Sequence, residues 1–282
     1  GNLAEAEKQL QILVTGPYKQ RVTNDPMLSY TQAIIAYDKK DLATAKEIAE
    51  RIVANTNNFP QLQLLLGSIN FQTKNYEQAE TQLKAFLATS PRNKQATRLL
   101  ATLQVIKQHP EEAVETLKQS LDDSETPDLT TLALLANASL RSGDSKQGEH
   151  YYQKALEQKP EESGLIYGLG QSYLMQGEHE KAIAEFAKIP EDSNQSLRAQ
   201  LTIIETYMKA GRTDEALATI QKLPNETQQT AIITSLKGTV YLMQKNLVSA
   251  QSQFNKSLEI EPGYAPAHRQ LALLATQAGD SA

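Results

Sequence analysis

The chain has 282 residues, a formal net charge of −5, 40% hydrophobic and 6% aromatic residues, and no cysteine. This acidic balance, with Lys and Arg scattered along the chain, argues against nucleic acid as a partner, because phosphate contacts supply most of the affinity of nucleic-acid-binding proteins. The absence of cysteine excludes disulfides and thiolate zinc sites. The sequence also contains no run of about 18 apolar residues, the length needed to span a membrane.

Small residues recur along the chain at a fixed interval. They stand at Ala79, Ala113, Gly148, Ala182, Ala216 and Ala250, at intervals of 34 residues with a single interval of 35. A period of about 20–50 residues indicates a stack of structural repeats in place of a globule with one central core. We therefore predict a repeat architecture.

The repeats can be placed in chain order. Residues 1–25 are expected to hold the second helix of an earlier repeat, with Ala6 and Leu10 in its packing positions, followed by a loop with extra residues within Gly16 to Asp25. Full repeats are predicted to start at Pro26, Pro60, Lys94, Leu129, Ser163, Leu197 and Ala231, with a terminal half-repeat over 265–282. The chain is thus predicted to be a single array. Gly1 and Gly279 fall at the position of an inter-helix turn. We therefore predict that this sequence is a window from a longer array.

Each repeat is predicted to form two antiparallel helices. In the clearest copy, Leu165, Leu169 and Tyr173 mark the apolar side of a first helix, and Ala182, Ile183 and Phe186 mark that of a second. The sequence Gln176-Gly177-Glu178 breaks the pattern between them, since Gly accepts the left-handed conformation that ends a helix. Small residues such as Gly170 and Ala182 are expected where the two helices cross.

The segment LGQSYLMQGEHEKAIAEFAKIP matches the signature of a known type of helical repeat. Its Leu169, Gly170, Tyr173, Gly177, Ala182 and Phe186 stand at the spacing of the tetratricopeptide signature. The chain resembles a tetratricopeptide-repeat (TPR) array. That resemblance implies an all-α fold, a right-handed superhelix of antiparallel helix pairs, and a non-catalytic scaffold that binds a protein or peptide in a concave groove lined by the first helices.

The resemblance also implies which side chains face the groove, at repeat positions 2, 5, 9, 12 and 13. The candidate binding residues are Tyr30, Tyr37, Phe71, Arg98, Asn137, Arg141, Tyr167, Gln171, Met175, Met208 and Met243. Two interpretations stay open for the aromatic residues: they contact a partner, or they pack against the first helix of the next repeat. The methionines favour an adaptable surface, because the Met side chain fits irregular partners.

No catalytic, metal or cofactor site is expected. The four histidines are far apart in sequence, and none has the spacing of a helical zinc pair. Gly164, Gly168 and Gly170 lie inside a predicted helix with no preceding strand, so packing explains them better than a phosphate loop does. Asn137 and Arg141 match part of the two-carboxylate clamp of chaperone-binding TPR domains, but the neighbouring repeats depart from it.

A more particular resemblance covers residues 26–121. The run from FPQLQLLLGSINFQ to EEAVETLKQSL is similar to the large TPR lipoproteins of bacterial exosortase (PEP-CTERM) and exopolysaccharide loci. It implies a scaffold on the periplasmic side of the cell envelope, with partners among secretion or polysaccharide-export components. Two alternatives stay open: a periplasmic solenoid that binds polysaccharide itself, and a cytoplasmic regulatory TPR module of a larger protein.

Overall fold

A computed structural model describes residues 3–15, 25–56, 59–121 and 127–277, and every regular element among them is a helix. The chain divides into two compact units, Gly1–Lys154 (unit 1) and Ala155–Ala282 (unit 2). The predicted all-α class is therefore confirmed. Gly1, Gly279 and most of the loop predicted before Pro26 lie outside the described residues.

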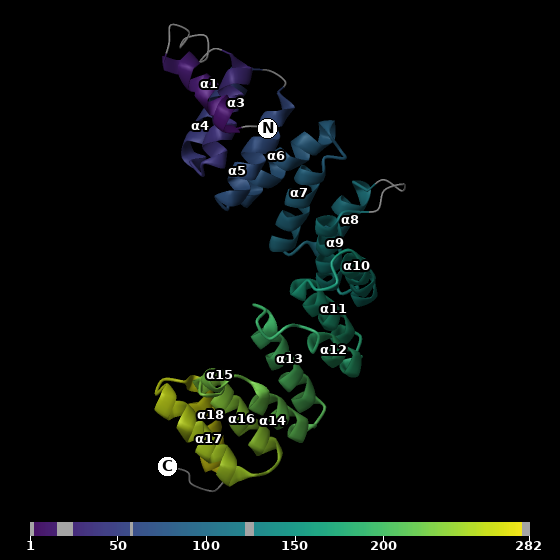
Figure 1. Ribbon diagram of the computed structural model, residues 1–282, viewed down its shortest axis with the longest axis vertical. Coiled ribbons are helices and arrows are strands. Elements are labelled where there is room, and N and C mark those ends of the chain that lie inside the picture. Colours follow the sequence, from purple (N-terminus) through teal and green to yellow (C-terminus); the bar gives the residue numbers. More distant parts are fainter. Residues whose placement is uncertain (1–2, 16–24, 57–58, 122–126, 278–282) are drawn as a thin grey trace. The chain divides into compact units, whose positions relative to one another are not determined.

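Unit 1 begins with helix α1 (Leu3–Thr15) and continues as helix pairs (Figure 1). The pairs are α3 (Pro26–Asp38) with α4 (Leu42–Asn55), α5 (Pro60–Gln72) with α6 (Tyr76–Thr89), α7 (Lys94–Ile106) with α8 (Pro110–Gln119), and α9 (Leu129–Arg141) with α10 (Ser145–Gln158). The last residues of α10 already belong to unit 2.

Unit 2 repeats the same arrangement. Its pairs are α11 (Ser163–Met175) with α12 (His179–Phe186), α13 (Ser196–Lys209) with α14 (Thr213–Lys222), and α16 (Ala231–Met243) with α17 (Leu247–Ile260), with the short α15 (Asn225–Gln228) before α16 and α18 (Ala265–Gln277) after α17. In both units, first helices start at the residues where the sequence period places them; α13 starts one residue early. That the units form one continuous array stays a prediction.

The turn between the two helices of each pair contains one residue in the left-handed backbone conformation. The three glycines predicted for this role, Gly143, Gly177 and Gly211, have φ values of +89°, +76° and +72°. The equivalent turns without glycine hold the same conformation, with φ between 60° and 67°, at Lys40, Lys74, Gln108 and Lys245. The residue after each one donates its backbone N–H to a carbonyl five residues earlier, as from Glu178 to Tyr173 (2.9 Å), which caps the first helix.

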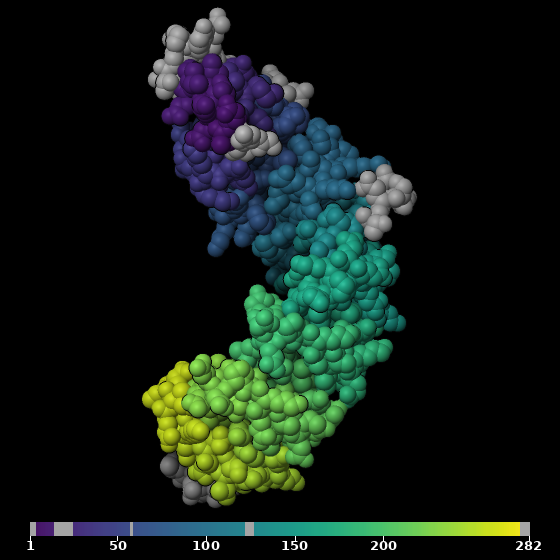
Figure 2. Space-filling view, in the orientation of Figure 1, coloured from purple at the N-terminus to yellow at the C-terminus, as the bar shows by residue number. Residues whose placement is uncertain are grey.

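The core of each unit lies between the helices of a pair and between neighbouring pairs. The periodic alanines Ala79, Ala113, Ala182, Ala216 and Ala250 are fully buried. Three first-helix glycines, Gly67, Gly170 and Gly238, face a larger residue of the second helix. The atoms nearest to a methyl group placed on Gly170 belong to Phe186, not to Ala182. Figure 2 shows the surface of each unit, coloured along the chain.

Candidate partner-binding face

One side of each first helix carries the residues predicted to face the groove, and we call this side the first-helix face. It consists of repeat positions 2, 5, 9, 12 and 13, which share one side of a helix because they are spaced by three or four residues. In unit 1 it is carried by α3, α5, α7 and α9, and in unit 2 by α11, α13, α16 and α18.

Position 12 is a half-buried, apolar residue in every full repeat. The residues are Tyr37, Phe71, Val105 and Leu140 in unit 1, and Leu174, Met208 and Leu242 in unit 2. Position 13 beside it is exposed and is apolar in three repeats, where the exposed fraction is 42% for Ile106, 52% for Met175 and 43% for Met243. The face therefore has a repeated apolar row whose outer members are open to solvent.

Position 5 joins each of three repeats to the next one. The ring of Tyr30 lies against that of Phe59, which precedes α5, with centroids 5.0 Å apart, and burial raises the pKa of the Tyr30 phenol. The Arg98 guanidinium pairs at 3.0 Å with Asp128, the N-cap of α9. For Tyr30, the ring contact is thus with the residue that precedes the next first helix, and contact of Tyr30 with a partner stays a prediction.

Tyr167 is one of the aromatic residues for which partner contact and packing both stayed open, and the structure shows extensive packing. Its side chain is 7% exposed, because the ring packs against Phe186 of its own repeat (centroids 5.2 Å) and under the guanidinium of Arg198 (4.2 Å). Its hydroxyl lies 3.2 Å from the Thr202 hydroxyl and accepts a bond of 2.9 Å from Gln171. The single-repeat signature did not reveal this burial, since two of the partners, Arg198 and Thr202, belong to the next first helix.

Two other predicted aromatic residues are also engaged. The Tyr37 hydroxyl accepts a hydrogen bond from the amide of Gln72 on α5, so this ring is tied to the following first helix. Phe71 is half-buried and faces Tyr76 at the start of α6, with centroids 6.3 Å apart. These rings retain only part of their surface for a partner.

The remaining predicted residues keep more surface. Asn137 and Arg141 on α9 are exposed, and Asn137 also bonds to Tyr152, whose pKa is raised by burial and partly lowered again by that bond. Met175 and Met243 are about half exposed, whereas Met208 is half-buried. Among the predicted binding residues, Asn137, Arg141, Met175 and Met243 are thus the exposed ones.

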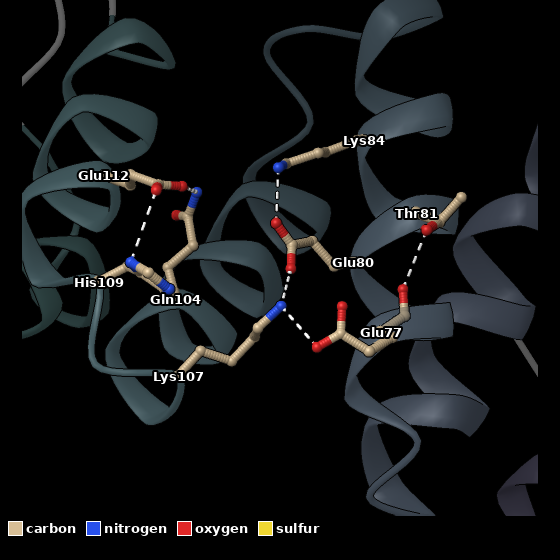
Figure 3. Close-up of polar contacts among 8 residues, drawn as sticks. All are labelled: Glu77, Glu80, Thr81, Lys84, Gln104, Lys107, His109 and Glu112. Atoms are coloured by element: carbon tan, nitrogen blue, oxygen red, sulfur yellow. Dashed lines mark hydrogen bonds and ion pairs between the residues drawn. The ribbon is translucent and has the colours of Figure 1, made fainter.

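Ion pairs at the inter-helix turns link one repeat to the next, and the sequence did not reveal them. In Figure 3, the Glu80 carboxylate of α6 lies between two ammonium groups, 2.6 Å from Lys84 and 2.6 Å from Lys107 at the end of α7. Lys107 also pairs with Glu77 at 2.9 Å. The hydrogen bonds from Lys107 and Lys84 lower the pKa of Glu80, and those to Glu80 and Glu77 raise the pKa of Lys107.

A weaker polar contact lies beside this cluster (Figure 3). The Gln104 amide donates to Glu112 at 3.4 Å, and His109 lies 3.7 Å from the same carboxylate. Comparable links between a second helix and the following turn join Glu180 to Arg212 and Asp214 to Gln244. These links hold neighbouring repeats in register.

Other kinds of site among the described residues would be metal sites or hollows away from the first-helix face. Over the described ranges, no group of three or more His, Asp or Glu side chains could hold a metal ion. A hollow of about 380 Å³ on unit 1 is lined by Val53, Thr56, Phe59, Pro60, Leu62, Gln63, Ala85 and Thr89, none of which belongs to the first-helix face.

Comparisons with known proteins agree with this geometry. One family model described as tetratricopeptide repeat matches residues 139–201 and 191–239, and a second model of the same description matches residues 74–126. The chain is built from tetratricopeptide repeats. No curated protein sequence matches this TPR chain significantly.

Solved structures with the same fold cover most of the TPR chain. A tetratricopeptide repeat protein from Parabacteroides merdae is 18% identical with a TM-score of 0.62, over 88% of this chain and 98% of that one. The C-terminal part of a TPR protein from Cytophaga hutchinsonii is 16% identical (TM-score 0.55; 95% and 94% covered). PilW, a type IV pilus biogenesis factor, is 14% identical (TM-score 0.52; 87% and 98%). At these identities the likeness establishes the TPR solenoid fold alone.

TPR domains generally bind proteins or peptides, so a role in protein–protein interaction follows from the repeats. Among the helices that the structure describes, none is long and apolar enough to cross a membrane.

Proposed function

We propose that this TPR protein is a non-catalytic scaffold that binds a peptide or helix of a partner protein along the first-helix face. The observation that carries the proposal is the apolar row at position 12 with exposed Met175 and Met243 beside it. Buried apolar area is the main source of affinity in helix-in-groove recognition, and flexible Met side chains accept partners of varied shape.

We also propose where the scaffold works: on the periplasmic side of a bacterial envelope, with partners among components of exopolysaccharide secretion or surface-protein sorting. The support is the sequence resemblance of residues 26–121. Fractionation of cells that express the natural full-length protein tests this part, and recovery in the cytoplasm alone would favour a cytoplasmic regulatory module.

Direct binding of polysaccharide is less well supported. It requires aromatic rings whose faces are open to stack on sugars. Tyr167 is covered by Arg198 and Phe186, and Tyr30 faces Phe59, so these rings are already used within the protein.

A peptide-display selection tests the scaffold function without assuming a partner. A random library with peptides of about 20 residues, roughly 30 Å long as a helix, is selected against the whole chain. The proposal expects binders that lose affinity when Met243→Ser is introduced at the end of α16. Ile260→Ser is the matched control, because Ile260 also ends a helix and is also 43% exposed, but on the second helix α17. Equal loss in both variants, or no binders, contradicts the proposal.

A further inference from the structure

The apolar row of unit 2 differs from that of unit 1 in composition. Positions 12 and 13 read Leu174-Met175, Met208-Lys209 and Leu242-Met243 on three successive first helices. Three of the four methionines of the chain stand in these pairs. In each pair the first residue is half-buried and the second is exposed. Unit 2 thus presents an apolar surface of Leu and flexible Met side chains, which suits the side of an amphipathic helix.

Charge is distributed unevenly between the two sets of helices in unit 2. Along α11, α13, α16 and α18, four basic residues stand against one acidic residue: Arg198, Lys209, Lys237 and Arg269 against Glu205. The second helices α12, α14 and α17 have the opposite balance, with Glu180, Glu185, Asp214, Glu215 and Glu259 against Lys181, Lys222 and Lys256. The first helices are therefore basic within a protein whose net charge is −5.

These basic groups lie where a partner on the face would meet them. Arg198, Lys209 and Arg269 are exposed, and all three occupy positions of the first-helix face. The Arg198 guanidinium is held over the Tyr167 ring at 4.2 Å, which limits its freedom before any partner arrives. Lys209 occupies the position that Met175 and Met243 occupy in the repeats before and after it.

We infer that the first-helix face of unit 2 binds an acidic amphipathic helix, whose apolar side covers the Leu and Met pairs and whose Glu or Asp side chains meet Arg198, Lys209 and Arg269. This inference rests on the proposed function and adds the chemistry of the partner. A nucleic acid fits less well, because its recognition needs accessible aromatic rings or a dense basic groove, and the Tyr167 ring is covered. Positive charge beside an apolar row is complementary to an acidic amphipathic helix.

Two synthetic peptides of about 20 residues test the inference with the whole chain. Both carry the same Leu and Met side, and their polar side is Glu-rich in one and Lys-rich in the other. Fluorescence anisotropy measures Kd at low and high salt. The Glu-rich peptide is expected to bind at least about tenfold more tightly, and salt should reduce that preference because the charges are exposed.

Charge variants locate the interaction. Lys209→Glu is expected to weaken the Glu-rich peptide about five- to tenfold, and Glu205→Gln to strengthen it about two- to threefold. Lys222→Glu is the matched control, since Lys222 is also exposed and lies in the last turn of its helix, but on the second helix α14. Thermal melting of each variant verifies that the fold is kept.

Several outcomes overturn the inference. Equal binding of both peptides, equal loss with Lys209→Glu and Lys222→Glu, or binding of a single-stranded DNA oligonucleotide in place of the Glu-rich peptide each contradicts it. If the display selection yields binders sensitive to Met243→Ser that are uncharged or basic, the scaffold function stands and the acidic partner is wrong. If neither the library nor the Glu-rich peptide binds, the scaffold function itself fails.

Discussion

A methyl group placed on Gly170 would lie 2.5 Å from Cε1 of Phe186, so the glycine of the first helix and the ring of the second helix occupy one shared space. The same relationship joins Gly238 to Phe254, at 2.7 Å. Where the second helix has the smaller Leu117, the first helix has Ala101, and both are buried. In the α5–α6 pair, a methyl group placed on Gly67 would lie 2.9 Å from Leu83, so a glycine also stands opposite a leucine. The match between a glycine and a ring is therefore a property of the two Gly–Phe pairs.

We expect Gly170→Ala to destabilise the protein by about 1–2 kcal/mol. Overpacking costs about 1–3 kcal/mol, which exceeds the gain of at most about 1 kcal/mol that Ala brings in a helix. Urea denaturation measures the change. Gly164→Ala in the same helix is the control: a methyl group there meets no atom within 4 Å, so this variant should be neutral or slightly stabilising.

A double variant tests the size match directly. Gly170→Ala combined with Phe186→Leu reproduces the Ala101 and Leu117 combination of the α7–α8 pair. The loss should be smaller than the sum of the two single losses, because the smaller side chain makes room for the methyl group. Strict additivity would show that the two residues do not share space.

The left-handed turn residues give a further prediction. Lys74 has φ of +60°, a conformation that costs a non-glycine residue about 1–2 kcal/mol. Lys74→Gly should therefore stabilise unit 1, by less than this amount because glycine also increases the entropy of the unfolded chain. Thermal melting measures the shift.

The reverse change serves as the counterpart. Gly177→Ala should destabilise unit 2 by about 1 kcal/mol, although a methyl group there meets no neighbour, since φ is +76°. Gly263→Ala, at a glycine that is equally open and not left-handed, should have little effect. A melting temperature that falls equally in both variants would exclude backbone conformation as the cause.

The 34-residue period was enough to predict the helices, because it records where small residues must be buried. It located Ala182 and Ala250 correctly, and both are fully buried. It paired Gly170 with Ala182, however, because both are small, whereas the structure pairs it with the large Phe186, which stands sixteen positions later. Packing depends on complementary volumes, and the signature specifies only which residues recur.

The binding face was harder to predict for a related reason. Tyr167 fits no core position of a single repeat, so partner contact and packing against the next first helix both stayed open. Its ring is covered by Arg198 of the next first helix, a contact that depends on the sequence of two repeats together. Met175 and Met243 are exposed at the ends of their helices, and their role in binding stays a prediction.

The ion cluster at the α6–α7 contact predicts a pH dependence. Hydrogen bonds from Lys107 and Lys84 lower the pKa of Glu80 below its ordinary value of 4.5. A carboxylate with a lowered pKa in the folded state stabilises the protein fully above the unfolded value, and this stabilisation is lost as the pH falls through the folded value. Stability should therefore decrease below about pH 4.5, and the decrease should be shallower in Glu80→Gln.

Urea midpoints measured between neutral and acidic pH test this expectation. The control is Glu47→Gln, an exposed change on α4 that leaves the Glu80 cluster intact. If both variants follow the pH profile of the unchanged protein, the Glu80 cluster does not contribute to the pH dependence of stability. High salt should reduce the difference only in part, because the side chains of Glu80 and Lys107 are just 16% and 22% exposed.

The last prediction separates packing from binding at Tyr167. Tyr167→Ala should cost about 3–5 kcal/mol, as expected for removing a large buried ring. Tyr167→Phe keeps the ring against Phe186 and loses only the hydroxyl contacts with Thr202 and Gln171, so it should cost about 1 kcal/mol. Peptide binding measured well below the melting temperature should be nearly unchanged in Tyr167→Phe. A large loss of affinity with unchanged stability would instead make the hydroxyl a contact for the partner.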